Sequence, residues 1–380
     1  MSLTGSPFGA AVTIVALLTF GAVVVGWPRL AGSGLAPILA RTGLLVALNV
    51  LVLGCVAVQL NDKYLFFADW ADLDGALGGH LAATPISRGA VGGSAAVRPV
   101  RGRAAVPSTV LPALPPPAGR PQGVITSTVR GALSGLTGTV IVRLPPGYTW
   151  PDRATVRYPV LETFSGYPGA PTQWLRTMSL GDAVDTAVAA GQLRPLLVVS
   201  PQVEFPRGVD TECVDGAPGP AVETWLTRDV PDWVARTYRV SGDRASWATI
   251  GLSAGGWCAA MATMLHPAQY SAAVVMGGYF SPWFGPNYEG VRPGSPGAAR
   301  YDLVAVARRP PPVALWLETS HSDPMSYTSS ARFLKGVRPP LSVDAVVLRN
   351  AGHRIAIWRD LLPQALTWLG RTVPGFRPSG

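Results

Sequence analysis

The residues around Ser253 have types and a spacing that could do chemistry. The stretch Gly251-Leu252-Ser253-Ala254-Gly255 places a serine between two glycines, after an apolar run and before a run with helical periodicity. Glycines on both sides relieve crowding in a sharp strand-to-helix turn, and that turn raises the serine hydroxyl above the sheet as a nucleophile. The alternative interpretation is a small residue in a tight structural turn, because the string alone also arises by chance in a glycine-rich chain.

A serine hydroxyl is a weak nucleophile at neutral pH and needs a general base, for which the chain offers four histidines. His80 precedes the serine, and His266 stands before a proline where a helix is expected to end. His321 comes too early to follow an acid in the chain order serine, acid, histidine. His353 falls between the last expected strand and the last expected helix. We predict His353 as the base, with a helix-capping histidine as the alternative.

The base needs a carboxylate to orient it, and two acidic residues are candidates. Asp323 lies in the loop after the apolar strand "VALWLE", and Pro324 stiffens the turn behind it. Glu318 lies at the end of that strand and is the alternative acid. Asp323 is the preferred prediction because a carboxylate on a loop can reach the histidine, although an ordinary Asx turn would also explain "SDP".

An oxyanion hole requires two backbone N–H groups directed at the developing charge. One is predicted to be the amide of Ala254, directly after the nucleophile, and the other the amide of Tyr167 in the loop "FSGYPG". A simple Gly-Pro turn is the alternative reading of that loop. Aromatic residues near these positions could line an acyl pocket, although such residues more often belong to the core; they are Trp174, Trp257, Tyr279, Phe280 and Trp283.

The elements that must position these residues follow an α/β pattern from residue 124 to residue 376. Two opening strands, "VITSTVRG" and "LTGTVIVRL", are expected to pair, and short apolar runs then alternate with helical segments. Each later run ends at a polar or glycine-rich tip, as in "SWATIGLSAGG" and "SVDAVVLRNAGH". The pattern predicts a mostly parallel central sheet flanked by helices, with its chemistry at the carboxyl ends of the strands.

The N-terminal 61 residues are predicted to be a membrane anchor with two transmembrane helices. Residues 8–27 carry no charge, and residues 44–60 form a second apolar run that reaches back through Pro37 and Arg41. No basic residue precedes the first run, which argues against a cleaved signal peptide. Arg29 and Arg41 place the connecting loop in the cytoplasm, so the large domain is expected to be extracytoplasmic in a multi-pass protein of the cell membrane.

Residues 62–123 are predicted to be a juxtamembrane segment followed by a linker. Aromatic residues in "NDKYLFFADWADLD" suit the headgroup region, and residues 82–123 are rich in Pro, Gly and Ala. The net charge of +9 comes from dispersed arginines without a basic run, so nucleic acid is not an expected partner.

The chain has three cysteines. Cys55 falls in the second apolar run and is expected to be a small apolar residue. Cys213 lies in a long loop and Cys258 lies five residues after the proposed nucleophile, so both are expected near the rim of the site. We predict a Cys213–Cys258 disulfide, which an exported domain permits, with two unpaired thiols as the alternative.

The ordered set "YPVLETFSGYPG", "IGLSAGGWCAA", "LETSHSDP" and "NAGHRIAIW" resembles the esterase D-type α/β-hydrolases, a family that includes mycolyltransferases and enterochelin esterases. The resemblance covers about residues 124–372, and the apolar N-terminus ending in "LNDKYLFFADWADL" is similar to that of membrane-anchored bacterial members. It implies an α/β-hydrolase fold and a serine hydrolase or acyltransferase that uses Ser253, Asp323 and His353 without a metal or organic cofactor. The chain departs from the family at Ala254, where many members carry Met, and in the "SGYPG" loop.

These observations predict acyl transfer through an acyl-enzyme on an acyl ester or lipid, with water or a sugar hydroxyl as acceptor. The location suggests a cell-envelope lipid or an acylated glycan as substrate. Two alternatives remain: a catalytically silent α/β-hydrolase-fold binding or structural protein, since fold alone does not carry function, and a peptidase with the same triad. The sequence gives no expectation for the oligomeric state.

Overall fold

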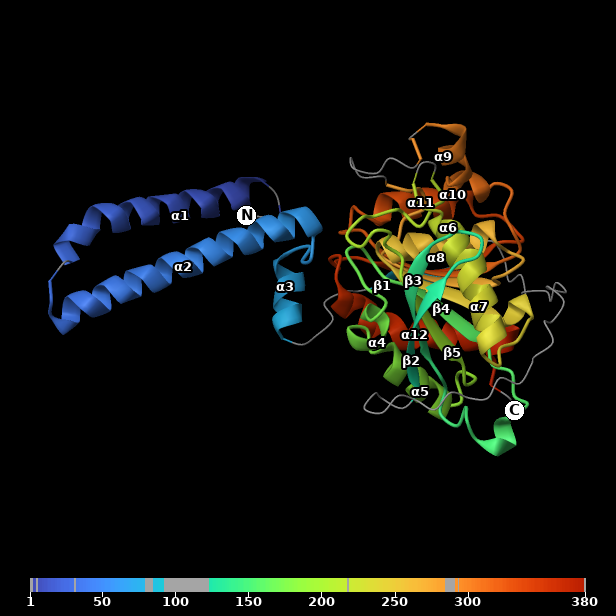
Figure 1. Ribbon diagram of the computed structural model, residues 1–380. Coiled ribbons are helices and arrows are strands. Elements are labelled where there is room, and N and C mark those ends of the chain that lie inside the picture. The colour runs from blue at the N-terminus through green and yellow to red at the C-terminus, as the bar shows by residue number, and fades with distance from the viewer. Residues whose placement is uncertain are drawn as a thin grey trace. The chain divides into compact units, whose positions relative to one another are not determined.

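The computed structural model describes residues 3–4, 6–30, 32–78, 85–91, 123–216, 219–283, 291–292 and 294–378. The chain divides into two compact units (Figure 1). The first, here called the hairpin unit, comprises Met1–Thr84 and the loop Asn350–Arg354. The second, the sheet unit, comprises Pro85–Arg349 and Ile355–Gly380.

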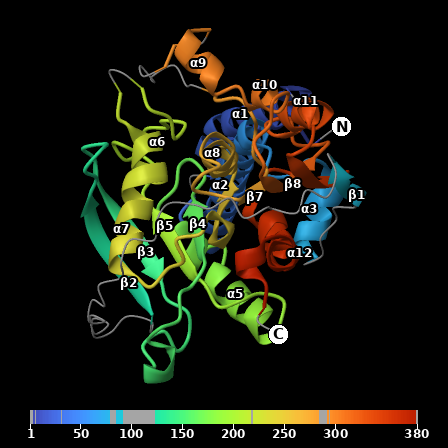
Figure 2. The same cartoon turned by 90° about the vertical axis from the view of Figure 1, so that its right-hand side faces the viewer.

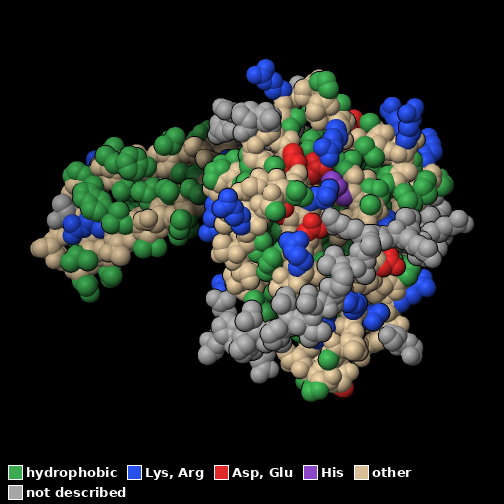
Figure 3. Space-filling view, turned by 45° about the vertical axis from the view of Figure 1, so that its right-hand side comes forward, with side chains coloured by type: hydrophobic (Ala, Val, Ile, Leu, Met, Phe, Trp, Pro, Cys, Tyr) green, Lys and Arg blue, Asp and Glu red, His purple; other side chains and the backbone are tan. Residues whose placement is uncertain are grey.

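The hairpin unit consists mainly of two long helices that lie side by side (Figure 1). Its elements are α1 (Ser6–Gly26), the 3-10 helix η1 (Trp27–Leu30), α2 (Leu35–Tyr64) and α3 (Trp70–Leu77). Both long helices have the length and apolar composition to cross a membrane. Hydrophobic side chains make up much of their surface in Figure 3, and Leu18 and Leu53 are each 68% exposed. Such a surface is suited to an apolar environment.

The sheet unit is built on nine strands in the order β1-β9-β8-β7-β6-β4-β5-β3-β2. Strands β5, β4, β6, β7, β8 and β9 are parallel to their neighbours in this order, while β1, β2 and β3 pair antiparallel. The predicted mostly parallel sheet and the predicted pairing of the two opening strands are therefore confirmed, and that pair is antiparallel. The strands are β1 (Pro85–Val91), β2 (Val124–Arg130), β3 (Thr137–Arg143), β4 (Val160–Phe164), β5 (Leu197–Pro201), β6 (Trp247–Leu252), β7 (Ala272–Met276), β8 (Ala314–Ser320) and β9 (Ser342–Leu348).

Helices cover both faces of this sheet (Figure 2). Helices α5 and α12 pack together on one face, and α7 and α8 lie on the other. The helices are α4 (Gln173–Arg176), α5 (Leu180–Ala189), α6 (Val222–Thr224), α7 (Val230–Thr237), α8 (Ala254–Leu265), α9 (Pro296–Arg300), α10 (Leu303–Val306), α11 (Tyr327–Gly336) and α12 (Ile355–Thr372). A π-helical turn, η3 (Trp225–Asp229), joins α6 to α7, and 3-10 turns occur at η2 (Pro151–Arg153), η4 (Arg244–Ser246) and η5 (Pro374–Phe376).

The central strands show no alternation of buried and exposed residues because both of their faces are covered. Every residue of β4, β5, β6, β7 and β8 is buried, whereas β2 at the edge alternates in part between buried and exposed positions. Continuous apolar runs are typical of parallel strands between two helical layers. The core at the centre of this sheet supports the strand ends where the predicted chemistry lies.

Part of the expected linker is instead a strand. Within residues 62–123, Pro85–Val91 form β1, which pairs antiparallel with β9 from Pro85 opposite Leu348 to Val91 opposite Val343. A sheet edge offers unpaired main-chain N–H and C=O groups, and main-chain pairing places few demands on side chains. The composition of this segment therefore did not reveal the strand. Residues 92–122 of the expected linker lie outside the described residues.

Candidate active site

Ser253 occupies a sharp turn between β6 and α8, as the sequence predicted. Its backbone has φ 55° and ψ −127°, a conformation that residues other than glycine rarely adopt. A Cβ added at Gly251 would lie 1.8 Å from the Gly255 carbonyl oxygen, and one added at Gly255 would lie 2.2 Å from the Phe164 carbonyl oxygen. Both glycines are therefore required by close backbone approach, and the turn holds the serine in a strained conformation.

The loop after β4 lies directly against this serine. A Cβ added at Gly166 would lie 3.2 Å from the Ser253 Cβ. The next residue, Tyr167, has an N–H group with no acceptor among the described residues, and Pro168 has no N–H. Ala254 begins α8, and the first N–H groups of a helix have no acceptor within the helix. The two predicted oxyanion donors thus come from segments that flank Ser253.

A buried carboxylate that the sequence analysis missed holds the Tyr167 loop in place. Glu204 is 6% exposed and accepts hydrogen bonds from Gly169 N–H at 2.6 Å and from Gly208 N–H at 2.7 Å. Gln173 Oε1 accepts from Gly166 N–H at 2.9 Å. The Tyr167 hydroxyl donates to the Gly208 carbonyl at 2.9 Å. An acidic residue within the apolar run after β5, "VVSPQVEF", was the available signal for Glu204.

The structure separates the two candidate acids by their environments. Asp323, 3% exposed, accepts from the Ser326 hydroxyl at 2.7 Å and from Met325 N–H at 3.1 Å. Glu318 accepts from Gly277 N–H at 2.9 Å. Burial raises the pKa of Glu318 to about 8, with a further increase from the Asp323 charge. Because Glu318 is then mostly protonated at neutral pH, it is poorly suited to stabilise a histidine cation.

His353 lies in the loop Asn350–Arg354, between β9 and α12. Ser253, Asp323 and His353 thus follow the carboxyl ends of β6, β8 and β9, which run in one direction. Two other histidines have structural partners. His266 Nε2 lies 2.6 Å from Glu223 Oε1, and the His321 ring hydrogen-bonds the Tyr327 hydroxyl at 3.1 Å. His80 lies outside the described residues.

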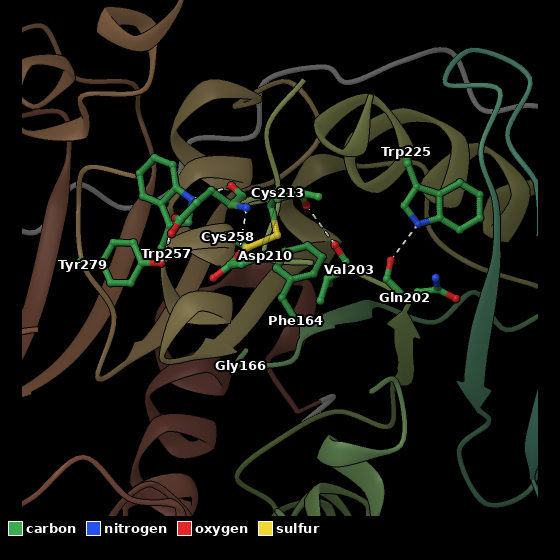
Figure 4. The surroundings of a disulfide bond; sticks show 12 residues. Phe164, Gly166, Gln202, Val203, Asp210, Cys213, Trp225, Trp257, Cys258 and Tyr279 are labelled. Carbon is green, nitrogen blue, oxygen red and sulfur yellow. Dashed lines mark hydrogen bonds between the residues drawn. A yellow bond between two sulfur atoms is a disulfide. The ribbon is translucent and has the colours of Figure 1, made fainter. Parts of the chain in front are cut away.

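The structure contains the predicted disulfide between Cys213 and Cys258, with a Cα separation of 5.7 Å (Figure 4). The bond joins the loop after β5 to α8. Beside it, Glu212 is buried and accepts from the Tyr279 hydroxyl at 2.8 Å on both carboxyl oxygens. The Trp257 indole N–H donates to the Glu212 carbonyl at 2.7 Å. Burial and then the neighbouring Asp210 charge raise the pKa of Glu212 to about 8.

The aromatic residues expected to line a pocket differ in exposure. Trp174 and Trp257 are completely buried and form part of the packed interior. Tyr279 lines a cleft of about 620 Å³. The other lining residues are Ser281, Pro282, Trp283, Asp302, Val304, Pro324, Met325, Thr328, Ser329 and Arg332. Because Pro324 and Met325 directly follow Asp323, this cleft borders the loop that carries Asp323.

A mostly parallel sheet with helices on both faces and a serine in the turn after a central strand defines an α/β-hydrolase. A ferulic acid esterase has the same fold, with a TM-score of 0.55 and 22% identity over 66% of this chain and 98% of that one. An S-formylglutathione hydrolase from Agrobacterium tumefaciens gives 0.56, with 13% identity over 67% and 97%. The fluorophosphonate-binding serine hydrolase F of Staphylococcus aureus gives 0.52, with 18% identity over 65% and 97%.

The chain belongs to the Esterase family, which matches residues 135–369. The family match supports a carboxylic ester hydrolase activity for these residues. An uncharacterized protein of Corynebacterium glutamicum is 26% identical over 245 residues, which cover 60% of this chain and 56% of that protein. The chain therefore spans just over half the length of this relative.

Proposed function

We propose that this chain is a membrane-anchored serine esterase or acyltransferase that acts on acyl esters through Ser253, His353 and Asp323. The observation that carries the proposal is the conformation of Ser253, whose positive φ is maintained between two glycines that no other residue could replace without a clash. Strain of this kind persists at functional sites because the surrounding structure enforces it. The flanking amides of Tyr167 and Ala254 are suited to receive an oxyanion.

In the proposed reaction, His353 accepts the Ser253 hydroxyl proton while the serine oxygen attacks the acyl carbonyl carbon. The tetrahedral oxyanion accepts hydrogen bonds from the N–H groups of Tyr167 and Ala254, and the Asp323 carboxylate stabilises the histidine cation. When the intermediate collapses, the C–O bond to the alcohol breaks, and the alcohol takes the proton from His353. The acyl group remains on Ser253.

The acyl-enzyme is then resolved by water or by the hydroxyl of an acceptor. This second nucleophile gives its proton to His353 and attacks the acyl carbon. Collapse of the second tetrahedral intermediate breaks the acyl–Ser253 bond and returns the proton to the serine oxygen. The product is a carboxylic acid when water attacks and a new ester when a sugar hydroxyl attacks.

The proposed location is the outer side of the cell membrane, with α1 and α2 as anchors. Arg29 and Arg41, which flank the turn between the two helices, favour a cytoplasmic position for that turn. The Cys213–Cys258 disulfide supports an oxidising compartment for the sheet unit. Together these features favour an envelope lipid or an acylated glycan as substrate.

The test is fluorophosphonate labelling of the full chain in detergent micelles. We expect wild type to be labelled and Ser253→Ala not to be labelled. Ser127→Ala, a change on the edge strand β2, is a matched control that keeps the wild-type rate. Folded wild-type protein that takes up no label would refute an activated serine. A separate, unlabelled sample of wild type can then be given a chromogenic ester with and without a sugar acceptor, which separates hydrolysis from transfer by the products formed.

A further inference from the structure

The loop that carries His353 contacts a distant part of the chain, the segment that follows α2. The backbone N–H of His353 donates to the Leu65 carbonyl at 2.7 Å. The preceding residue, Gly352, donates its N–H to Asp72 Oδ2 at 3.0 Å. A Cβ added at Gly352 would lie 2.2 Å from the Phe66 carbonyl oxygen. The two segments therefore approach so closely that only glycine fits.

The following residue of the loop is held by a buried ion pair. Arg354 pairs with Asp72 through Nη1, and its side chain is 10% exposed while that of Asp72 is completely buried. The same guanidinium donates to the Phe66 carbonyl at 3.1 Å and lies 5.0 Å from the centroid of the Phe67 ring. Residues on both sides of His353 are thus attached to the same short segment.

That segment is itself held by local hydrogen bonds. Asn61, near the end of α2, is 7% exposed, donates its side-chain amide to the Phe67 carbonyl at 3.0 Å and accepts from Phe67 N–H at 2.8 Å. Leu65 ends α2 in a left-handed conformation with φ 54°. Asp69 caps α3 by accepting from Asp72 N–H at 2.8 Å. The turn between α2 and α3 therefore has one defined geometry, which the ion pair transmits to the loop.

We propose that Asp72 is a positioning residue for His353, so that the segment after the second anchor helix sets the orientation of the general base. The inference rests on the proposed function, because it takes His353 to be that base. Asp72 does not touch the substrate and acts through Gly352 and Arg354. A buried ion pair adds little net stability but fixes geometry, which is the property that a proton-transfer group needs.

The experiment uses the full chain in detergent with Asp72→Asn and Asp72→Ala, and with Asp74→Asn as the matched control, since Asp74 is exposed on the same helix. Fluorophosphonate gives two readouts: the final labelled fraction counts folded sites, and the rate constant of labelling reports the action of the base on Ser253. We expect wild-type labelled fractions throughout. In Asp72→Ala the labelling rate constant and the kcat for a chromogenic ester should each fall by about 10- to 100-fold. The KM for that ester should stay within about twofold of wild type.

Asp72→Asn keeps the side-chain shape and an oxygen for Gly352 N–H but removes the charge, so its loss should be smaller. Asp74→Asn should match wild type. A wild-type labelling rate in Asp72→Ala, or a loss only in proportion to a reduced labelled fraction, would overturn the positioning role. If wild type is not labelled, or if His353→Ala is labelled as fast as wild type, the proposed function itself fails and the inference fails with it.

Discussion

Removal of the Cys213–Cys258 disulfide should destabilise the protein by an amount that follows from the loop it closes. The two cysteines are 45 residues apart. In the chain-entropy model, closing a loop of this length removes about 13 cal/mol/K from the unfolded ensemble, or about 4 kcal/mol at 25 °C. With an unfolding entropy of about 2.1 cal/mol/K per residue over roughly 250 residues, the melting temperature should fall by about 8 °C.

Activity should fall as well, because the disulfide anchors a strained loop. Glu212 and Cys213 both have positive φ, at 51° and 54°. Without the bond this loop can relax, and Glu204, earlier in the same loop, then holds the Tyr167 segment less firmly. We therefore expect the Cys213→Ala/Cys258→Ala variant to show a lower kcat/KM at temperatures where it remains folded.

The assay is thermal unfolding of the full chain in detergent, followed by near-UV circular dichroism with and without reductant. Cys55→Ala is the matched control, because Cys55 is a free thiol in α2. Reductant should lower the melting temperature of wild type and of Cys55→Ala but leave the double variant unchanged. A double variant that melts within about 2 °C of wild type would rule out this stabilisation by the disulfide. Alkylation of both thiols in the native protein without reductant would rule out the bond itself.

Three further predictions follow from buried carboxyl groups. Asp323→Asn should lower kcat by about 10³- to 10⁴-fold. The kcat of Glu318→Gln should stay within a few-fold of wild type at pH 7, since burial raises the pKa of Glu318 to about 8. Ester hydrolysis kinetics measure both values, and a larger loss in Glu318→Gln than in Asp323→Asn would contradict the assignment of the acid. Glu204→Gln should slow fluorophosphonate labelling by about 10- to 100-fold with an unchanged labelled fraction. The two carboxyl oxygens of Glu204 each accept one N–H, from Gly169 and from Gly208, and the amide replaces one of these oxygens with a donor. An unaltered labelling rate would argue against a role of Glu204 in holding the Tyr167 loop. Burial raises the pKa of Glu162 from the ordinary 4.5 to about 8, against a lowering by the Tyr270 hydrogen bond. The contribution of this group to stability is therefore highest below pH 4.5 and is lost as pH rises through 8. Glu162→Gln should remove up to about 1.4 kcal/mol per pH unit from the slope of the unfolding free energy between pH 5 and 9, measured with denaturant, whereas an identical slope in both proteins would show that Glu162 is ionised in the fold.

The sequence predicted those features that depend on local pattern and chain order. Fully buried strands are readable as apolar runs, and the glycines around Ser253 are required by a turn formed within five residues. The order of elements then placed Asp323 and His353 after later strands of the same sheet. The disulfide was predictable because Cys258 follows Ser253 on a short stretch of helix and the chain has few other thiols.

The features that the sequence did not predict depend on contacts between distant segments. Glu204 holds the Tyr167 loop from 35 residues away, and Asp72 reaches Gly352 across 280 residues. Strand β1 pairs through main-chain groups, which leave little trace in composition. Trp174 and Trp257 are large aromatic residues of the type that often lines a pocket. Each donates its indole N–H to a backbone carbonyl and packs in the interior.

Buried carboxylates recur where a loop of the proposed site has to be held in one geometry. Glu204 binds two backbone amides of different turns, and Asp72 binds a backbone amide and a guanidinium. Burying a charge is costly, and apolar contacts would stabilise the fold at least as well. Apolar contacts are non-directional, however, whereas a carboxylate that accepts several donors fixes their relative positions. Because proton transfer and oxyanion binding both depend on sub-ångström placement, the positions of these two carboxylates favour a role in setting catalytic geometry over a role in stability.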